Sequence, residues 1–512
     1  MNRVHIEFQR VQSWLFAVPR LRAMVGANTR LGEVLRLELP ELARANRNWK
    51  LAPCDDAESY PTADEHDPLA AHDDPSADAR HGILARDGGH FEAQFCKGAK
   101  EFADAAAELI RRELPGLRFR IWIDGMERQE APTSISTELP VLAPCEWTGR
   151  GVASAVIQQG TERAAVSMEV ARRHEAARRA EGGLAQDLAS LLAKTTKLAS
   201  LRRAQDLEDL VGSGYLALVQ ADGNGVGSAA GNKSDVERAR FYHRNRVLIR
   251  RALKDAIDTL VSRGRLPAAP GQSAPLLLLM LGGDDLLVIC RAETALPFVV
   301  SLCEQLAALQ HGNTNGFELT LGVGVVIAKH KIPIHRLHEV AESLVASAKR
   351  RFRGMRHACM PPRSVVDWAV YTTSWVDDPE EIRRRDWIRG AGSDRRILSQ
   401  RPVDVLGDGL QSLQGLLDGA YKLQNQNAPR SQLRYLVDQL GRGRVLAELA
   451  FKELSPSARR ALASAGVKEP WRQVADNGVW VTELLDLIEI AEIGRLGRSA
   501  EATRSAAEVA HG

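Results

Sequence analysis

The sequence predicts an α+β fold that contains two ferredoxin-like domains, helices that connect them, and an all-helical domain after them. Three observations carry this prediction: two similar segments that each contain a Gly-Gly turn, a stretch between them rich in Ala, Arg, Glu and Leu, and a helical period beyond Tyr371. The chain of 512 residues is long enough for roughly three or four domains.

The two similar segments span 83–97 and 277–291. Each has an apolar stretch, a Gly-Gly dipeptide and a second stretch that ends at a Cys, which is the pattern of a β-hairpin. A helix and a returning strand follow each hairpin, and a strand and a helix precede it; the leading strands are Val4–Phe8 and Tyr215–Ala221. The resulting order β-α-β-β-α-β is a ferredoxin-like sheet, the architecture called a palm.

These elements divide the chain into four predicted regions. They are a first palm domain over 1–130, a connecting helical region over 131–210, a second palm domain over 211–375 and a C-terminal helical domain over 376–512. An acidic stretch that contains Pro and His, Asp55–Ala79, interrupts the first copy. We expect this stretch to be a long mobile loop.

The composition excludes several classes of protein. Lys and Arg total 68 against 65 Asp and Glu, so the net charge of +3 does not indicate a protein that coats nucleic acid. The six cysteines follow no metal-ligand spacing and suggest no disulfide framework. The apolar run Ala274–Leu281 is too short to span a bilayer, and the N-terminus has no signal-peptide core. We therefore expect a cytoplasmic protein without a membrane segment.

Candidate catalytic carboxylates lie at two strand ends of the second copy. One strand ends at Asp222, and the hairpin turn between two apolar strands carries Asp284 and Asp285. These strands are neighbours in a ferredoxin-like sheet, so we expect the three carboxylates to meet at one edge. Mg²⁺, or Mn²⁺ in its place, takes oxygen ligands and keeps part of its shell for phosphate. Two such ions can activate a ribose 3′-hydroxyl and neutralise the phosphates, so the pattern predicts nucleotidyl transfer.

Each candidate metal ligand has an expected role. Asp222 and Asp284 would bridge the two ions, the backbone carbonyl of Gly223 would be an additional ligand, and Asp285 would bind or orient the second ion. The sequence shows no general base, and the metal itself can acidify the attacking hydroxyl.

Glycines around these carboxylates predict contact with a nucleotide. Gly282 and Gly283 permit the tight turn and let a nucleotide lie against the backbone, while Gly225 and Gly227 leave amide groups free to cradle a triphosphate. The alternative reading is that Asp and Gly only form turns here. The first copy has the sequence GGHF at 88–91, so it keeps the turn and lacks the carboxylates.

Four stretches resemble the large polymerase/cyclase-like subunit of type III CRISPR effector complexes, in the form that lacks the N-terminal HD nuclease domain. That subunit carries two palm domains and is similar to GGDEF cyclases in its core. The resemblance extends over roughly residues 1–375 and is carried by the stretches 6–27, 221–227, 281–289 and 322–349.

The resemblance implies ATP as the substrate, cyclic oligoadenylate as the product, and activity that is switched on in an antiviral complex when guide RNA pairs with target RNA. It also implies an acceptor ATP site in the first palm, with Gly26, Gly88 and Gly89 among its contacts, and places Lys349 near the triphosphate and Asn224 in the nucleotide-binding loop. The helical C-terminal domain and the near-neutral charge lead us to expect small helical and RNA-binding partner subunits.

The sequence departs from the family pattern at several points. Relatives often hold zinc between the palms with paired cysteines, whereas only Cys145 is present here, so we expect no zinc. Asn224 stands where relatives often have Asp, and Gly26 begins a Gly-Ala-Asn-Thr string where Gly-Ala-Ser is usual. His330, His335 and His338 are expected at the surface. Two other functions stay open: a cyclase that makes another cyclic nucleotide or dinucleotide, and a non-catalytic scaffold that binds nucleotide or RNA.

Overall fold

The structure of the chain is a computed structural model. The chain divides into two compact units, the first with Met1–Ser200, Gly225–Lys254 and Leu278–Leu286, the second with Leu201–Asn224, Asp255–Leu277 and Leu287–Gly512. The first similar segment lies wholly in the first unit and the second is divided between the two units, and the four predicted domain boundaries stay a prediction. The structure describes residues 1–45, 47–128, 143–159, 162–181, 188–204, 206–211, 214–266, 273–312, 316–372, 378–474 and 478–496.

The first sheet has the strand order β2-β4-β1-β5-β6, with β3 paired to β4. β1 runs antiparallel to β4 and β5, and its alternate residues Val4, Ile6 and Phe8 are buried, because one face of the sheet covers the core. The predicted order β-α-β-β-α-β is confirmed by β1, α2, β3, β4, α5 and β5. The elements are β1 (Asn2–Gln9), α1 (Val11–Leu15), α2 (Leu21–Glu33), η1 (Val34–Glu38), α3 (Leu39–Arg44), β2 (Lys50–Leu51), η2 (Ala57–Ser59), η3 (Ala70–His72), α4 (Pro75–Arg80), β3 (Ile83–Asp87), β4 (His90–Lys97), α5 (Ala99–Glu113), β5 (Arg118–Ile123) and β6 (Met126–Glu127).

The stretch Asp55–Ala79 is not the mobile loop that the sequence predicts. It forms the short helices η2 and η3 and most of α4, and its carboxylates Asp67 and Asp73 are buried. Both accept hydrogen bonds from Arg250 Nη1, at 2.9 and 2.8 Å. Partners more than a hundred positions away along the chain therefore fix this segment.

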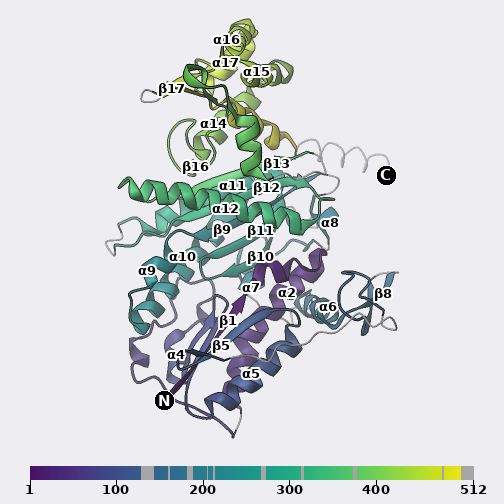
Figure 1. The fold of residues 1–512 in the computed structure, drawn as a ribbon, viewed down its shortest axis with the longest axis vertical. Helices are drawn as coiled ribbons and strands as arrows, with labels where there is room; N and C mark the ends of the chain where they lie inside the picture. Colours follow the sequence, from purple (N-terminus) through teal and green to yellow (C-terminus); the bar gives the residue numbers. More distant parts are fainter. Residues whose placement is uncertain are drawn as a thin grey trace. The chain divides into compact units, whose positions relative to one another are not determined.

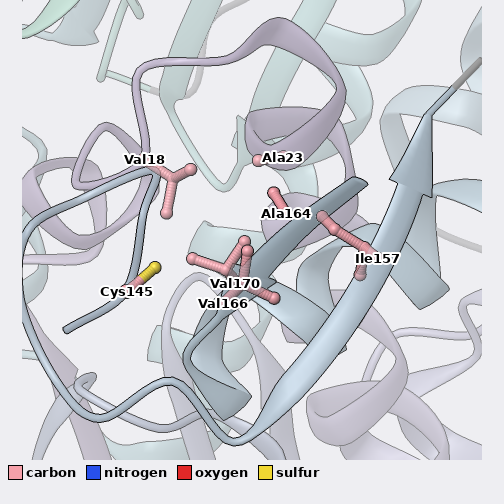
Figure 2. Packing of buried hydrophobic residues seen from close by; sticks show 7 residues of the cluster. All are labelled: Val18, Ala23, Cys145, Ile157, Ala164, Val166 and Val170. Atoms are coloured by element: carbon pink, nitrogen blue, oxygen red, sulfur yellow. The ribbon is translucent and has the colours of Figure 1, made fainter. Parts of the chain in front are cut away.

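The connecting region contains a hairpin as well as the predicted helices. The antiparallel strands β7 (Ala155–Gln159) and β8 (Glu162–Val166) precede α6 (Met168–Glu181), α7 (Leu188–Thr195) and α8 (Leu207–Val211). The purely helical prediction was wrong here because the Ala-rich composition obscured two five-residue strands. Figure 2 shows the apolar cluster that this hairpin covers, with Cys145 among Val18, Ala23, Ile157, Ala164, Val166 and Val170.

The second sheet has the strand order β10-β11-β9-β12-β13-β16. β12 runs antiparallel to β9 and parallel to β13, and α12 makes the connection between the two parallel strands. α11 and α12 pack on this sheet (Figure 1). The elements are β9 (Tyr215–Gly223), α9 (Val226–Ala230), α10 (Asp235–Ser262), β10 (Leu276–Gly282), β11 (Asp285–Arg291), α11 (Ala292–Gln310), β12 (Leu321–Lys329), α12 (Ile334–His357), β13 (Val365–Tyr371) and β16 (Val403–Asp404).

One helix among the described residues, α11, is long and apolar enough to cross a membrane if only length and composition are considered. Of its most apolar window, 61% is buried within the fold. A helix in the core of a domain meets the same criterion, so this observation is weak evidence for a membrane span.

The C-terminal region is mostly helical but is not all-helical as predicted. A four-stranded sheet with the order β14-β15-β18-β17 lies among its helices. Its strands have only two or three residues each, too few to give a period in the sequence, which explains the error. The elements are α13 (Pro379–Ile382), η4 (Arg383–Trp387), β14 (Ile388–Arg389), η5 (Gly392–Asp394), β15 (Arg396–Ile397), α14 (Leu413–Asn425), α15 (Arg430–Arg442), α16 (Arg444–Glu453), α17 (Pro456–Ser464), β17 (Arg472–Val474) and β18 (Val479–Val481).

Candidate active site

Asp222 lies at the end of β9, where the buried strand reaches solvent. The strand is buried from Leu216 to Ala221, and Asp222 is directly opposite Gly322 of the antiparallel neighbour β12. The Asp222 side chain is 33% exposed, and its carboxylate forms an ion pair with the ammonium group of Lys349. The structure thus gives Asp222 a cationic partner that solvent can reach.

Lys349 reaches Asp222 because α12 lies very close to β12. Gly324 permits this approach: a Cβ at that position would lie 2.5 Å from the carbonyl oxygen of Ala341 on α12. The aliphatic part of Lys349 then passes over Gly322, where a Cβ would lie 2.9 Å from Lys349 Cγ. The sequence resemblance placed Lys349 near a triphosphate, and the structure places it on a candidate metal ligand.

Asn224 points into the fold. Its backbone N–H donates to the carbonyl of Thr320 at 2.8 Å, and its Nδ2 donates to Thr320 Oγ1 at 3.2 Å. The residue is 2% exposed, and Oδ1 is buried without a hydrogen-bond partner among the described residues. Asn224 therefore holds the loop after β9 against the residue that precedes β12, and a carboxylate at this position would be buried.

The glycines near Asp222 lie at the end of β9, in the turn that follows it and in α9. Gly223 pairs with Leu321 across β9 and β12. Gly225 adopts φ 71°, a left-handed conformation that favours glycine, and precedes α9. Gly227 has open space where a Cβ would be. Of the two glycines predicted to cradle a triphosphate, Gly225 thus lies in the turn before α9 and Gly227 lies within α9.

The turn between β10 and β11 contains Gly282, Gly283, Asp284 and Asp285. Gly283 has φ 59°, and both glycines have open space in place of a side chain. Partial burial raises the pKa of the Tyr242 phenol on α10, and the negative charge of Asp284 raises it further. Tyr242 is an exposed neighbour of Asp284 that sequence reasoning missed, since nothing distinguishes it from other residues of a long helix.

The corresponding turn of the first copy has a different environment. Gly88 and Gly89 have φ values of 62° and 78°, and the preceding Asp87 accepts hydrogen bonds from Arg246 and Arg250. His90 stacks on His5 with 5.5 Å between ring centroids, and burial together with His5 lowers its pKa. This turn keeps the glycine conformation and carries a histidine in place of a carboxylate.

Gly26, predicted to contact a nucleotide, packs against another helix. A Cβ on this residue of α2 would lie 1.8 Å from the carbonyl oxygen of Arg173 on α6. Close helix packing accounts for the glycine without a nucleotide, and a nucleotide contact stays a prediction.

Cys145 is buried in the apolar cluster of Figure 2. Burial raises the pKa of its thiol, but hydrogen bonds from the Thr148 hydroxyl and from nearby backbone amides outweigh burial and lower the pKa overall. No group of three or more His, Cys, Asp or Glu that could hold a metal occurs among the described residues. The shared metal site of Asp222, Asp284 and Asp285 and the expected lack of zinc both stay predictions.

Comparison with known proteins gives a family match in the middle of the chain. Residues 215–357 match the family model of the Cas10/Cmr2 second palm domain. A search of curated proteins found no match.

Solved structures of Csm1 are similar to the chain. The Csm1–Csm4 cassette in complex with cA4 is 12% identical with a TM-score of 0.44, and the alignment covers 96% of this chain and 69% of that one. For Csm1 in T.onnurineus, the identity is 13%, the TM-score 0.41, and the coverage 96% and 69%. For the Csm1–Csm4 cassette in complex with AMPPNP, the sequence identity is 12% and the TM-score is 0.37. That match covers 68% of this chain and 53% of the other, so this chain spans about half the length of that structure.

Proposed function

We propose, from the premise that residues 215–357 are a second palm domain of the Cas10/Cmr2 family, that this chain is a nucleotidyltransferase that makes cyclic oligoadenylate from ATP. In this proposal it is the signalling subunit of a cytoplasmic type III CRISPR complex, activated when guide RNA pairs with target RNA. One observation carries the proposal: this domain has Asp222 at the solvent-accessible end of a strand and the Gly-Gly-Asp-Asp turn at 282–285.

The strand order supports a joint role for these carboxylates. β9 ends one residue after Asp222, β11 begins at Asp285, and the two strands are neighbours in the sheet. In a β-α-β-β-α-β unit these two strands run in opposite directions, so the end of one and the beginning of the other belong to the same edge. We assign Asp222, Asp284 and Asp285 to catalysis on this basis.

The donor set fits Mg²⁺ or Mn²⁺. Carboxylate oxygens are the ligands these ions prefer, and the carboxylate of Asp222 already stabilises a positive charge, the ammonium of Lys349. Asp222 and Asp284 would hold the ions with the carbonyl of Gly223, and Asp285 would orient the second ion. When bound, the metal acidifies the ribose 3′-hydroxyl and neutralises charge on the phosphates.

The remaining assignments concern the nucleotides and the partners. The backbones of Gly225, Gly227, Gly282 and Gly283 would lie against the donor ATP, and Lys349 would bind its phosphates. We interpret the first sheet as a degenerate palm whose turn at 88–90 binds the acceptor ATP without metal. Small helical and RNA-binding subunits would complete the complex, and zinc has no role in it.

Replacement of both turn carboxylates tests the proposal. Asp284→Ala/Asp285→Ala is expected to lower ATP conversion by roughly 100-fold or more, since metal ligation supplies several kcal/mol of transition-state stabilisation. The measurement is chromatography of products after incubation of the assembled complex with target RNA and single nucleotides. The control is Asp438→Ala, which removes an exposed carboxylate on α15.

The outcomes separate the candidate functions. Loss of cyclic oligoadenylate with intact assembly supports the proposal. A different cyclic product from the wild-type protein would show a cyclase of another specificity. Unchanged activity in the double variant, or no nucleotide turnover by the wild-type complex, would overturn the catalytic assignment and favour a scaffold.

A further inference from the structure

The ion pair between Asp222 and Lys349 depends on the absence of a side chain at one position of β12. That position is Gly322, the residue directly opposite Asp222. A Cβ at position 322 would lie 2.9 Å from Lys349 Cγ and 3.1 Å from Asn224 Oδ1, and both distances are shorter than ordinary van der Waals contact. The Lys349 side chain therefore occupies space that any residue other than glycine would fill.

The backbone is held in place both near Asp222 and near Lys349, and the lysine side chain that joins the two sites is flexible. On one side, the hydrogen bonds of Asn224 to Thr320 hold the loop that follows Asp222. On the other side, the close approach of α12 at Gly324 fixes the backbone that carries Lys349. The four-carbon side chain of lysine has several rotatable bonds, so its ammonium group can change partners without backbone movement.

Solvent reaches the ion pair. The side chains of Lys349 and Asp222 are 30% and 33% exposed. An ion pair of this exposure is weak and is readily exchanged for another ion. A divalent cation that approaches Asp222 meets the lysine ammonium at the same carboxylate, and the two positive charges repel each other.

We propose that Lys349 is the counter-ion of Asp222 when no divalent cation is bound, and that cation binding releases its ammonium group to the phosphates of the nucleotide. This inference rests on the proposed function, which makes Asp222 a metal ligand. Lys349 is then a positioning residue with two successive partners, and Gly322 is the residue that gives it access to the first. Cation and lysine exclude each other on Asp222, so binding of the cation prepares the lysine for the nucleotide.

Binding of Mn²⁺ alone to the full-length protein, without nucleotide, tests this exchange. Lys349→Met removes the ammonium and keeps a long side chain, so we expect Mn²⁺ to bind about twofold to fivefold more tightly, the equivalent of one exposed ion pair. The difference should shrink at high salt, which screens the pair. Lys329→Met, which changes an exposed lysine at the end of β12, is the matched control and should leave Mn²⁺ affinity unchanged. Titration followed by electron paramagnetic resonance measures free Mn²⁺ directly.

Gly322→Ala provides a second route to the same result. The added methyl group displaces the Lys349 side chain, so Mn²⁺ affinity should rise as in Lys349→Met while the lysine itself is retained. Unfolding temperatures close to that of the wild type establish that both variants fold. Mn²⁺ affinity that is unchanged or weaker in both variants would overturn the inference.

Asp222→Asn separates this inference from the proposed function. If Asp222→Asn weakens Mn²⁺ binding and Lys349→Met does not strengthen it, Asp222 is a metal ligand and only the exchange is wrong. If Asp222→Asn leaves Mn²⁺ binding unchanged, the metal site of the proposed function fails, and the exchange fails with it.

Discussion

Asp87 and Asp222 belong to corresponding ends of the two sheets, and their environments are opposite. Asp87 precedes the Gly-Gly turn of the first copy; its side chain is 8% exposed and is surrounded by the guanidinium groups of Arg36, Arg246 and Arg250. Asp222 is 33% exposed and pairs with one flexible lysine. The buried carboxylate is held by three arginines, whereas the carboxylate that solvent reaches is held by one lysine, the arrangement on which the proposed exchange depends.

The environment of Asp87 is part of a larger buried network in the first unit. Arg250 bonds Asp67, Asp73 and Asp87 at 2.8–3.1 Å, and Arg246 also approaches Asp73 and Asp87. Burial alone would raise the pKa of Asp73 and Asp87, but the surrounding arginines outweigh burial and lower both. The network therefore keeps its carboxylates charged and joins the 55–79 segment to α10.

The largest expected effect comes from breaking this network. Arg250→Met leaves Asp67 and Asp73 buried without their main partner, so we expect the free energy of unfolding to fall by about 3–5 kcal/mol. Urea unfolding measures the change. Arg251→Met, on the same helix and without a place in the network, should cost less than about 1 kcal/mol. An equal cost for the two variants would mean that the buried pairs do not stabilise the fold.

A smaller effect on the free energy of unfolding is expected from the pH, through a buried histidine on α12. His338 is buried, contrary to the prediction that it lies at the surface, and burial lowers its pKa to about 4, with Glu339 opposing. The unfolded chain takes up this proton near pH 6.5 while the folded chain does not, so stability is lost as the pH falls from about 6.5 to 4. The loss should reach roughly 2–3 kcal/mol.

Histidine variants on the same helix check this pH dependence. His338→Gln should flatten the dependence of the unfolding free energy on pH between 6.5 and 4, and His335→Gln, which changes an exposed histidine, should leave it unchanged. Parallel slopes for the wild type and His338→Gln would contradict the assignment.

The parts of the fold that the sequence predicts are those with local patterns. The two Gly-Gly turns, the apolar strands beside them and the order β-α-β-β-α-β were predicted correctly, and β9 was expected over Tyr215–Ala221 and observed over Tyr215–Gly223. Strands of two or three residues in the C-terminal region have no such pattern and were missed.

Contacts between distant segments could not be predicted from a single sequence. The bond between Asp67 and Arg250 joins residues 183 positions apart, so nothing near Asp67 distinguishes a buried carboxylate from one in a solvated loop. The inward orientation of Asn224 depends in the same way on Thr320, 96 positions away. Asp222 and the turn at 282–285 became candidates because carboxylates and glycines at strand ends predict metal and nucleotide binding, and their role stays a prediction. The ion pair between Asp222 and Lys349 depends on packing at Gly322 and Gly324, which the sequence alone does not indicate.

The smallest effect on stability is expected for an ion pair that is largely exposed to solvent. Arg336 and Glu339 form an ion pair at 2.8 Å on α12, with side chains 62% and 58% exposed. Water and salt screen such a pair, and ordering two long side chains offsets most of the attraction, so Arg336→Met should change the free energy of unfolding by no more than about 0.5 kcal/mol. Urea unfolding at low and at high salt measures it. A cost near that of Arg250→Met would show that burial is not what separates structural from exchangeable ion pairs in this chain, because the two pairs have the same chemistry and differ chiefly in their access to solvent.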